Sequence, residues 1–210
     1  MWTARAVRTP GELTIEATLP MAGFHVVREF RLLPDAAVAV VRETVRNRNQ
    51  LGRPYNMVQH PTIGPPFLDE SVVVDSNARQ GFMQSSPMPN PEQPTVVWPQ
   101  ALHDGAPVNL RRLTSGHEPN VVSFVIDEPQ GWVTAANAGK GLLIGYSWDT
   151  AEYPWLNIWR HAPNGKPVAR GLEFGTTGLH QPFPVLMRKR AIFDRPLLSY
   201  STCRLNLSAI

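Results

Sequence analysis

The chain has 210 residues, of which 42% are hydrophobic and 18% are charged, which excludes a disordered or coiled-coil protein. Its formal net charge is +3, and its densest basic run, Arg188 to Arg190, is too short for the broad basic face of a nucleic-acid-binding protein. No apolar run reaches the roughly 18 residues that a membrane-spanning helix needs. We therefore expect one domain over residues 1–210, with no nucleic-acid or membrane partner. The sequence does not indicate an oligomeric state.

The first part of the chain has the pattern of a β-meander. Apolar and polar residues alternate over residues 13–19, and a second apolar pattern covers residues 24–32. A turn with proline and glycine separates these two segments. Residues 38–45 are nearly continuous in β-branched side chains, which predicts a more deeply buried strand. Antiparallel strands joined by short turns account for all three segments.

Further short strands are predicted along the rest of the chain, separated by loops rich in proline. They cover residues 55–59, 121–127, 132–138, 141–148, 155–160 and 168–174, and two more strands are expected within 184–207. Loops are expected at 61–70 and 84–93, and no amphipathic helix of ten residues or more is found. These features predict an all-β protein, a large antiparallel β-sandwich.

Cysteine usage and the N-terminus suggest a compartment. Cys203 is the one cysteine, so no internal disulfide can form, and its apolar surroundings predict a small buried side chain. The first residues lack the apolar core of a signal peptide. A cytoplasmic location is therefore expected.

A histidine at the end of a predicted strand is the first candidate catalytic group. The strand at 55–59 delivers His60, and the loop that follows, rich in proline and glycine, would leave one side of the imidazole accessible. Histidine titrates near neutral pH, so it can donate or accept a proton there. The alternative is a histidine that only satisfies loop carbonyls.

A glutamate between two apolar residues is the second candidate. If Leu172 and Phe174 face the core, Glu173 faces the opposite way, and Gly171 and Gly175 would let a ligand or another backbone approach closely. Apolar neighbours can raise the pKa of a carboxylic acid toward that of a useful base. An exposed glutamate, paired with a nearby arginine, is the alternative.

The strand at 155–160 combines aromatic and polar side chains. Trp155, Asn157, Trp159 and His161 share one strand face, while Arg160 lies on the other unless the strand bulges. Sugars offer C–H faces to aromatic rings and hydroxyls to polar groups, so this face suits a carbohydrate. The tryptophans could equally fill the core of a sandwich.

Together these segments resemble the aldose 1-epimerase (galactose mutarotase-like) family. The features follow the same order: a strand that ends at Asn47, then Gln59-His60-Pro61 before Phe67-Leu68, then Gly171-Leu172-Glu173 after a tryptophan-rich strand. Family members are usually longer at the N-terminus, where they supply an arginine and a further histidine. The resemblance therefore implies a galactose mutarotase-like supersandwich that lacks the N-terminal strands of longer members.

The resemblance implies an isomerase that interconverts aldose anomers. Carried over, the general acid falls on His60 and the general base on Glu173, with a monosaccharide or sugar derivative as substrate. No metal and no cofactor are expected. The candidate substrate-binding residues are Asn56, Trp155, Asn157, Trp159, Arg160 and His161. A non-catalytic carbohydrate-binding module and a purely structural sandwich remain as alternatives.

Overall fold

The computed structural model describes residues 1–5, 9–84, 95–112, 121–201 and 205–209. The predicted loop at 84–93, apart from Gln84, and Cys203 lie outside the described residues. The chain divides into two compact units, Met1–Tyr55 with Ser199–Ile210 as unit 1, and Asn56–Leu198 as unit 2. A single domain over residues 1–210 stays a prediction.

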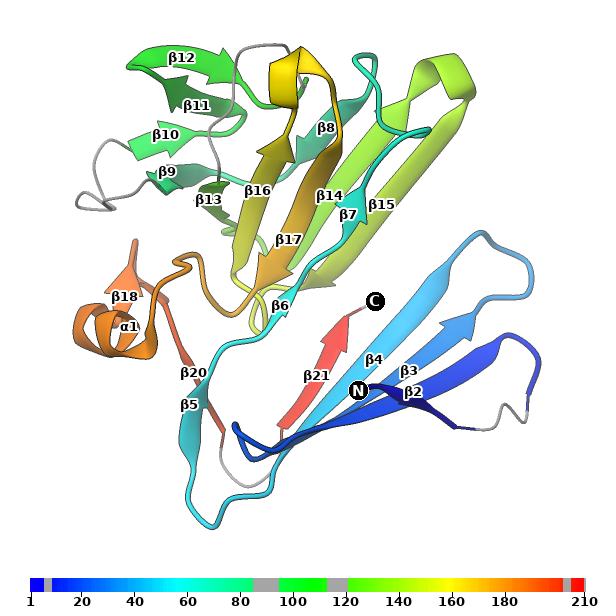
Figure 1. Ribbon diagram of the computed structural model, residues 1–210, viewed down its shortest axis with the longest axis vertical. Helices are drawn as coiled ribbons and strands as arrows, with labels where there is room; N and C mark the ends of the chain where they lie inside the picture. The colour runs from blue at the N-terminus through cyan, green and yellow to red at the C-terminus, as the bar shows by residue number, and fades with distance from the viewer. Residues whose placement is uncertain (6–8, 85–94, 113–120, 202–204, 210) are drawn as a thin grey trace. The chain divides into compact units, whose positions relative to one another are not determined.

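Unit 1 is an antiparallel sheet, and the predicted meander at its centre is confirmed. The strands lie in the order β1 (Thr3–Ala4), β2 (Glu12–Leu19), β3 (Phe24–Leu32), β4 (Ala39–Asn47) and β21 (Leu205–Ala209) (Figure 1). A separate short pair joins β5 (Arg53–Tyr55) to β20 (Ser199–Ser201).

The third strand of the meander is less buried than its sequence predicts. Only Glu43 and Val45 of β4 are buried, while Arg42 and Arg46 are exposed. An antiparallel sheet can keep one face in water, so a β-branched run does not require burial on both faces. Glu43 tolerates burial because the guanidinium of Arg28 on β3 donates to its carboxylate.

Unit 2 contains two antiparallel sheets. Sheet I has the order β10 (Thr95–Val97), β9 (Gln80–Gln84), β13 (Val121–Val125), β16 (Trp155–His161), β17 (Ala169–Gly175) and β6 (Val58–Gln59), and β7 (Thr62–Ile63) also pairs with β17. Sheet II joins β15 (Leu142–Asp149), β14 (Gln130–Asn137) and β8 (Val73–Ser76). Two hairpins and two short 3₁₀ helices complete the strand framework: β11 (Gln100–His103) with β12 (Ala106–Asn109), β18 (Ala191–Ile192) with β19 (Arg195–Pro196), η1 (Ala138–Lys140) and η2 (Pro163–Gly165).

Aromatic side chains join the inner faces of the two sheets. Trp148 on β15 stacks on Phe174 on β17, with ring centroids 4.2 Å apart and ring planes 5° apart. The inner face of sheet I continues through fully buried Leu156, Ile158 and Leu172. Because side chains alternate along a strand, Glu173 must point to the outer face of sheet I, away from sheet II.

The segment after β17 contains a short helix that the sequence did not predict. Two strands were expected within residues 184–207, and the short pair β18 and β19 lies there with β20 after it, but the helix α1 (Phe183–Lys189) precedes them. Leu186 on one side of this helix is fully buried. Arg188 and Lys189 lie in the last turn of the helix, where their positive charges interact favourably with the negative end of the helix dipole. The described residues contain no α-helix longer than these seven residues, and no helix long and apolar enough to cross a membrane.

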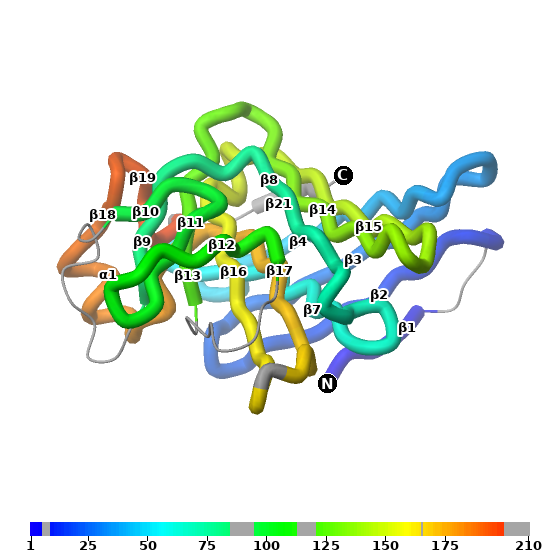
Figure 2. The backbone as a smooth tube through the Cα atoms, turned by 90° about the horizontal axis from the view of Figure 1, so that it is seen from above, coloured from blue at the N-terminus to red at the C-terminus, as the bar shows by residue number. Residues whose placement is uncertain are grey.

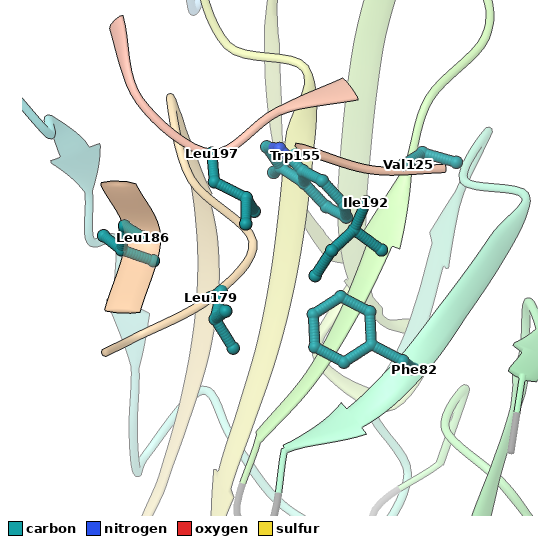
Figure 3. Packing of buried hydrophobic residues seen from close by; sticks show 7 residues of the cluster. All are labelled: Phe82, Val125, Trp155, Leu179, Leu186, Ile192 and Leu197. Carbon is teal, nitrogen blue, oxygen red and sulfur yellow. The ribbon is translucent and has the colours of Figure 1, made fainter. Parts of the chain in front are cut away.

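This segment covers part of the outer face of sheet I. Figure 2 shows α1, β18 and β19 on the same side of unit 2 as β9, and Figure 3 shows the apolar side chains through which Phe82 of β9 meets this segment. The cluster consists of buried Phe82, Val125, Trp155, Leu179, Leu186, Ile192 and Leu197. Burying apolar surface is worth about 25 cal/mol per Å², so the cluster fixes the segment on the sheet.

Candidate active site

Strand pairing brings the two predicted catalytic residues together. The predicted strand at 55–59 is split into β5 and β6, and β6 pairs with β17 so that Gln59 lies opposite Phe174. The next residue, His60, therefore reaches the level of Glu173. The His60 Nε2 atom lies 2.8 Å from Glu173 Oε1. Two residues remote in sequence thus meet at one position of sheet I.

The pair lies in a cleft of about 290 Å³, at the lower limit of small-molecule sites. The cleft is lined by Val58, His60, Val121, Trp159, Glu173 and His180. The side chain of His60 is 56% exposed and that of Glu173 only 3%. The imidazole is therefore exposed to solvent, whereas the carboxylate is buried.

Burial makes the Glu173 carboxyl a stronger base than an ordinary glutamate. Desolvation raises its pKa, and the charge of His60 opposes that rise. Its second oxygen, Oε2, is buried and has no hydrogen-bond partner among the described residues. A carboxylate in this position can accept a proton more readily than one in water.

A threonine fixes the orientation of the His60 ring. The Nδ1 atom of His60 lies 3.0 Å from Thr62 Oγ1, and the Thr62 hydroxyl is also 3.4 Å from the His60 carbonyl oxygen. Thr62 belongs to β7, which pairs with β17 opposite Gly171. The same strand therefore anchors both Glu173 and the residue that holds His60, which keeps Nε2 directed at the carboxylate.

Both glycines around the glutamate have close neighbours, but only Gly175 shows the close approach of another backbone that the sequence predicts. A Cβ atom at Gly171 would lie 2.8 Å from Glu173 Oε1, and one at Gly175 would lie 2.8 Å from the Met57 carbonyl oxygen. Gly171 therefore leaves room for the carboxylate itself. Gly175 leaves room for the backbone that leads to His60.

The aromatic strand contributes only its outer end to the cleft. Trp159 lines the cleft, with its ring 6.5 Å from that of His60, and exposed His161 stacks on Trp159 at 6.0 Å and 10°. Trp155 is instead in the core, where it packs in the cluster over sheet I and donates to the Pro196 carbonyl. The prediction that Trp155 contacts a sugar is therefore wrong, because the α1 segment covers that end of β16.

The remaining predicted binding residues lie outside the cleft lining. Asn157, opposite Glu173 on β16, is fully buried and donates to the Thr177 carbonyl. Asn56 is half-buried and does not line the cleft. Arg160 is buried on the inner face of sheet I, opposite Arg170. The prediction that Arg160 contacts a ligand in the cleft is therefore wrong.

Sequence reasoning missed one residue of the cleft, His180. It follows Gly178 and Leu179 after the end of β17, and its Nε2 atom lies 3.9 Å from Glu173 Oε2. Strand periodicity gives no information there because the strand has ended. The one signal available was a histidine shortly after the glycine-flanked glutamate.

Unit 1 has a hollow of similar volume with a different chemistry. Its charged residues oppose each other across strands, Glu12 against Arg31 and Glu29 against Arg42. Exposed opposite charges of this kind contribute little and are typical of a solvated sheet face. Within the described part of the chain, no group of three or more histidine, cysteine, aspartate or glutamate side chains is arranged to hold a metal ion.

Comparisons with known proteins identify the fold. No family model matches the chain, and no curated protein matches it in sequence. Solved structures do match: a galactose mutarotase related enzyme from Lactobacillus acidophilus (TM-score 0.67, 11% identity, 99% of this chain and 69% of that one) and a "putative aldose 1-epimerase" from Escherichia coli K12 (0.65, 16%, 99% and 66%). A protein with the same description from Klebsiella pneumoniae matches with a TM-score of 0.65 and 13% identity, over 96% of this chain and 50% of that one.

These likenesses establish the class of fold. The chain has the galactose mutarotase-like all-β fold, as the sequence predicts. It spans about half to two thirds of the length of these solved structures.

Proposed function

We propose that the protein is an isomerase of the aldose 1-epimerase kind, which interconverts the anomers of a monosaccharide. The observation that carries the proposal is the 2.8 Å contact between His60 Nε2 and Glu173 Oε1 at the wall of a small cleft. The fold adds support, because similar structures bear the names aldose 1-epimerase and galactose mutarotase related enzyme. Trp159 offers an apolar ring to the C–H face of a sugar.

The proposed reaction needs two proton transfers. Glu173 removes the proton from the C1 hydroxyl while protonated His60 donates a proton to the ring oxygen, and the bond between C1 and that oxygen breaks. The product is the open-chain aldehyde. Rotation about the C1–C2 bond and reclosure, with the two residues in reversed roles, gives the other anomer. Each positioned transfer is typically worth about 10²–10⁴ in rate.

The exposure of the two side chains fits these roles. The raised pKa of Glu173 suits a base that must later return its proton, and burial is its cause. The His60 ring is 56% exposed, so it can separate from the carboxylate and admit a sugar hydroxyl. Thr62 would remain its contact during that movement.

Polarimetry of freshly dissolved aldoses tests the proposal. The wild-type protein should accelerate the approach to anomeric equilibrium, and His60→Ala and Glu173→Gln should each lower kcat/KM by about 100-fold or more. His103→Ala is the matched control, because His103 also lies beside a carboxylate, 3.6 Å from Asp104, but does not line the cleft. Wild-type protein that accelerates no aldose would contradict the proposal.

One observation favours a non-catalytic carbohydrate-binding protein as the second candidate. His60 and Glu173 are already in hydrogen-bond contact, so a sugar must separate them before either can act on it. Calorimetry decides between the two candidates. Heat of sugar binding without interconversion of anomers would favour the binding protein, and binding with interconversion would favour the isomerase.

A further inference from the structure

The Glu173 carboxylate faces a histidine at each of its two oxygens. His60 Nε2 is in hydrogen-bond contact with Oε1, whereas His180 Nε2 is 3.9 Å from Oε2, about 1 Å beyond contact. Oε2 is also the oxygen that has no hydrogen-bond partner among the described residues. A buried carboxylate oxygen without a donor is costly once the group carries its charge.

The backbone that carries His180 is held firmly on both sides. The Gln84 side chain donates to the Gly178 carbonyl at 2.9 Å and accepts from the His180 amide at 3.1 Å. Leu179 between them is buried in the apolar cluster, and its amide donates to the Thr177 hydroxyl at 3.1 Å. The backbone position is thus fixed, while the imidazole ring keeps 35% of its surface exposed and can move.

We propose that His180 is a positioning residue that closes onto Glu173 Oε2 when a sugar separates His60 from Oε1. This inference rests on the proposed function, in which the sugar enters between His60 and Glu173. A movement of about 1 Å by the His180 ring gives a hydrogen bond of ordinary length. The carboxylate would then keep one donor throughout the reaction.

The protonation state of His180 suits this role. Burial lowers its pKa, and the charge of His60 lowers it further, so the ring is neutral at pH 7 and can donate through Nε2–H. The neighbouring strand presents neutral Asn157 and Trp159 to the same side of sheet I. Among the described residues that line the cleft, His60 and His180 are therefore the titratable groups facing Glu173.

The role predicts a specific pattern of kinetics. The acid limb of kcat reports the pKa of Glu173 in the sugar complex, whereas that of kcat/KM reports the free protein. Loss of the His180 donor should raise the pKa of the base in the complex, so His180→Phe should lower kcat about tenfold on the acid limb and little at alkaline pH. The limb of kcat/KM should move less, because His60 still bonds Oε1 in the free protein.

A titration without turnover tests the inference independently. His60→Ala removes the first donor, as the sugar is proposed to do, and ¹³C NMR of the labelled Glu173 carboxyl then follows its protonation. Adding His180→Phe to this variant should move the titration to higher pH, and His180→Gln, which keeps a donor near the Nε2 position, should restore it. His103→Phe, whose side chain has a similar exposure of 36%, should change nothing.

The outcomes separate the two proposals. If the wild-type protein interconverts no anomers, the proposed function fails, while the Glu173 titration still decides whether His180 acts on the carboxylate. If His180→Phe leaves that titration unchanged in the His60→Ala background, or if His180→Gln does not restore it, the inference about His180 is overturned. An equal movement of the kcat and kcat/KM limbs would also overturn it, because that pattern indicates a general structural effect.

Discussion

The two faces of strand β17 each bury a charged side chain, and they do so in different ways. On the inner face, the Arg170 guanidinium is fully buried and donates to the carbonyl oxygens of Leu110 and Arg111. On the outer face, Glu173 contacts His60 and lies 3.9 Å from His180, beside an open cleft. Backbone carbonyls cannot give or take a proton, whereas imidazoles can. A buried charge therefore indicates chemistry only when its partners can titrate.

The pKa values of the two groups follow from the same burial. Desolvation lowers the pKa of Arg170 to about 9, with a further contribution from the charge of Arg160, and it raises the pKa of Glu173. Arg170 remains protonated at neutral pH despite this change. Glu173 moves toward the range in which a base works, so equal burial has a functional consequence on one face only.

The largest expected effects come from exchanging the two charges for neutral groups. Arg170→Ala should destabilise the protein by about 3 kcal/mol, because it leaves a cavity and removes the donors of two carbonyls. Glu173→Gln should instead lower activity about 100-fold or more with little loss of stability. Denaturant unfolding and polarimetry measure the two effects, and a severe loss of stability in Glu173→Gln would break the distinction.

The next effect concerns the room that the carboxylate needs. In Gly171→Ala, the new methyl group would lie 2.8 Å from Glu173 Oε1 and 3.2 Å from Trp159 Cβ, so the carboxylate must leave its present position. We expect kcat/KM to fall about 10- to 100-fold. Gly145→Ala on β15, whose nearest contact is the Thr134 methyl at 3.4 Å, is the control and should retain activity. Equal activity of the two variants would show that the carboxylate position is not critical.

A smaller effect is expected from the residue that holds the His180 backbone. Gln84→Ala removes the bonds to the Gly178 carbonyl and the His180 amide but leaves the imidazole in place. The ring should lose alignment rather than its donor, so kcat should fall about two- to fivefold, less than in His180→Phe. A larger loss of kcat in Gln84→Ala than in His180→Phe would show that activity depends on the loop conformation rather than on the imidazole.

The smallest effect is on the pH dependence of stability. Because burial raises the pKa of Glu173 above its ordinary value of 4.5, the folded protein binds this proton more tightly than the unfolded chain. Its contribution is complete below that value and is lost as the pH rises through the folded-state pKa. The stability of Glu173→Gln relative to wild type should therefore increase as the pH rises from 4.5 through the folded-state pKa. Denaturant midpoints measure this difference, and a constant difference would contradict it.

The contribution of His180 to stability has the opposite sign. Its pKa is lowered from 6.5 by burial, so its neutral form is favoured in the folded protein and its contribution is lost as the pH falls below that value. Comparison of wild type with Glu173→Gln keeps His180 in both proteins. The comparison therefore reports the glutamate together with its interactions with His60 and His180, which both face it.

Sequence alone predicted the parts of the fold and site that depend on local pattern. Alternation between Leu172 and Phe174 placed Glu173 on the outer face, and it put Arg160 on the opposite face from Trp159. The strand that delivers His60 was also recognised, although it is divided at residues 56 and 57. These features follow from the two-residue period of a strand, which a sequence displays directly.

The remaining features depend on segments that meet only in the folded chain. Trp155 and Trp159 share a face, and their different exposure is decided by the α1 segment, which covers one and not the other. His180 lies near Glu173 on a backbone that a glutamine from β9 holds. Neither contact leaves a periodic signal in the sequence, so strand patterns could not locate them.

The proposed acid–base pair, His60 and Glu173, lies at the boundary between the protein interior and water, and this position should determine the route of isotope exchange. Glu173 has almost no contact with solvent, whereas most of the His60 ring is exposed. A deuteron from heavy water would therefore reach the carboxylate chiefly by way of the exposed imidazole of His60. Small buffer molecules that contact the ring should therefore accelerate the exchange of the carboxyl hydrogen with solvent. Bulky buffer molecules should accelerate this exchange less.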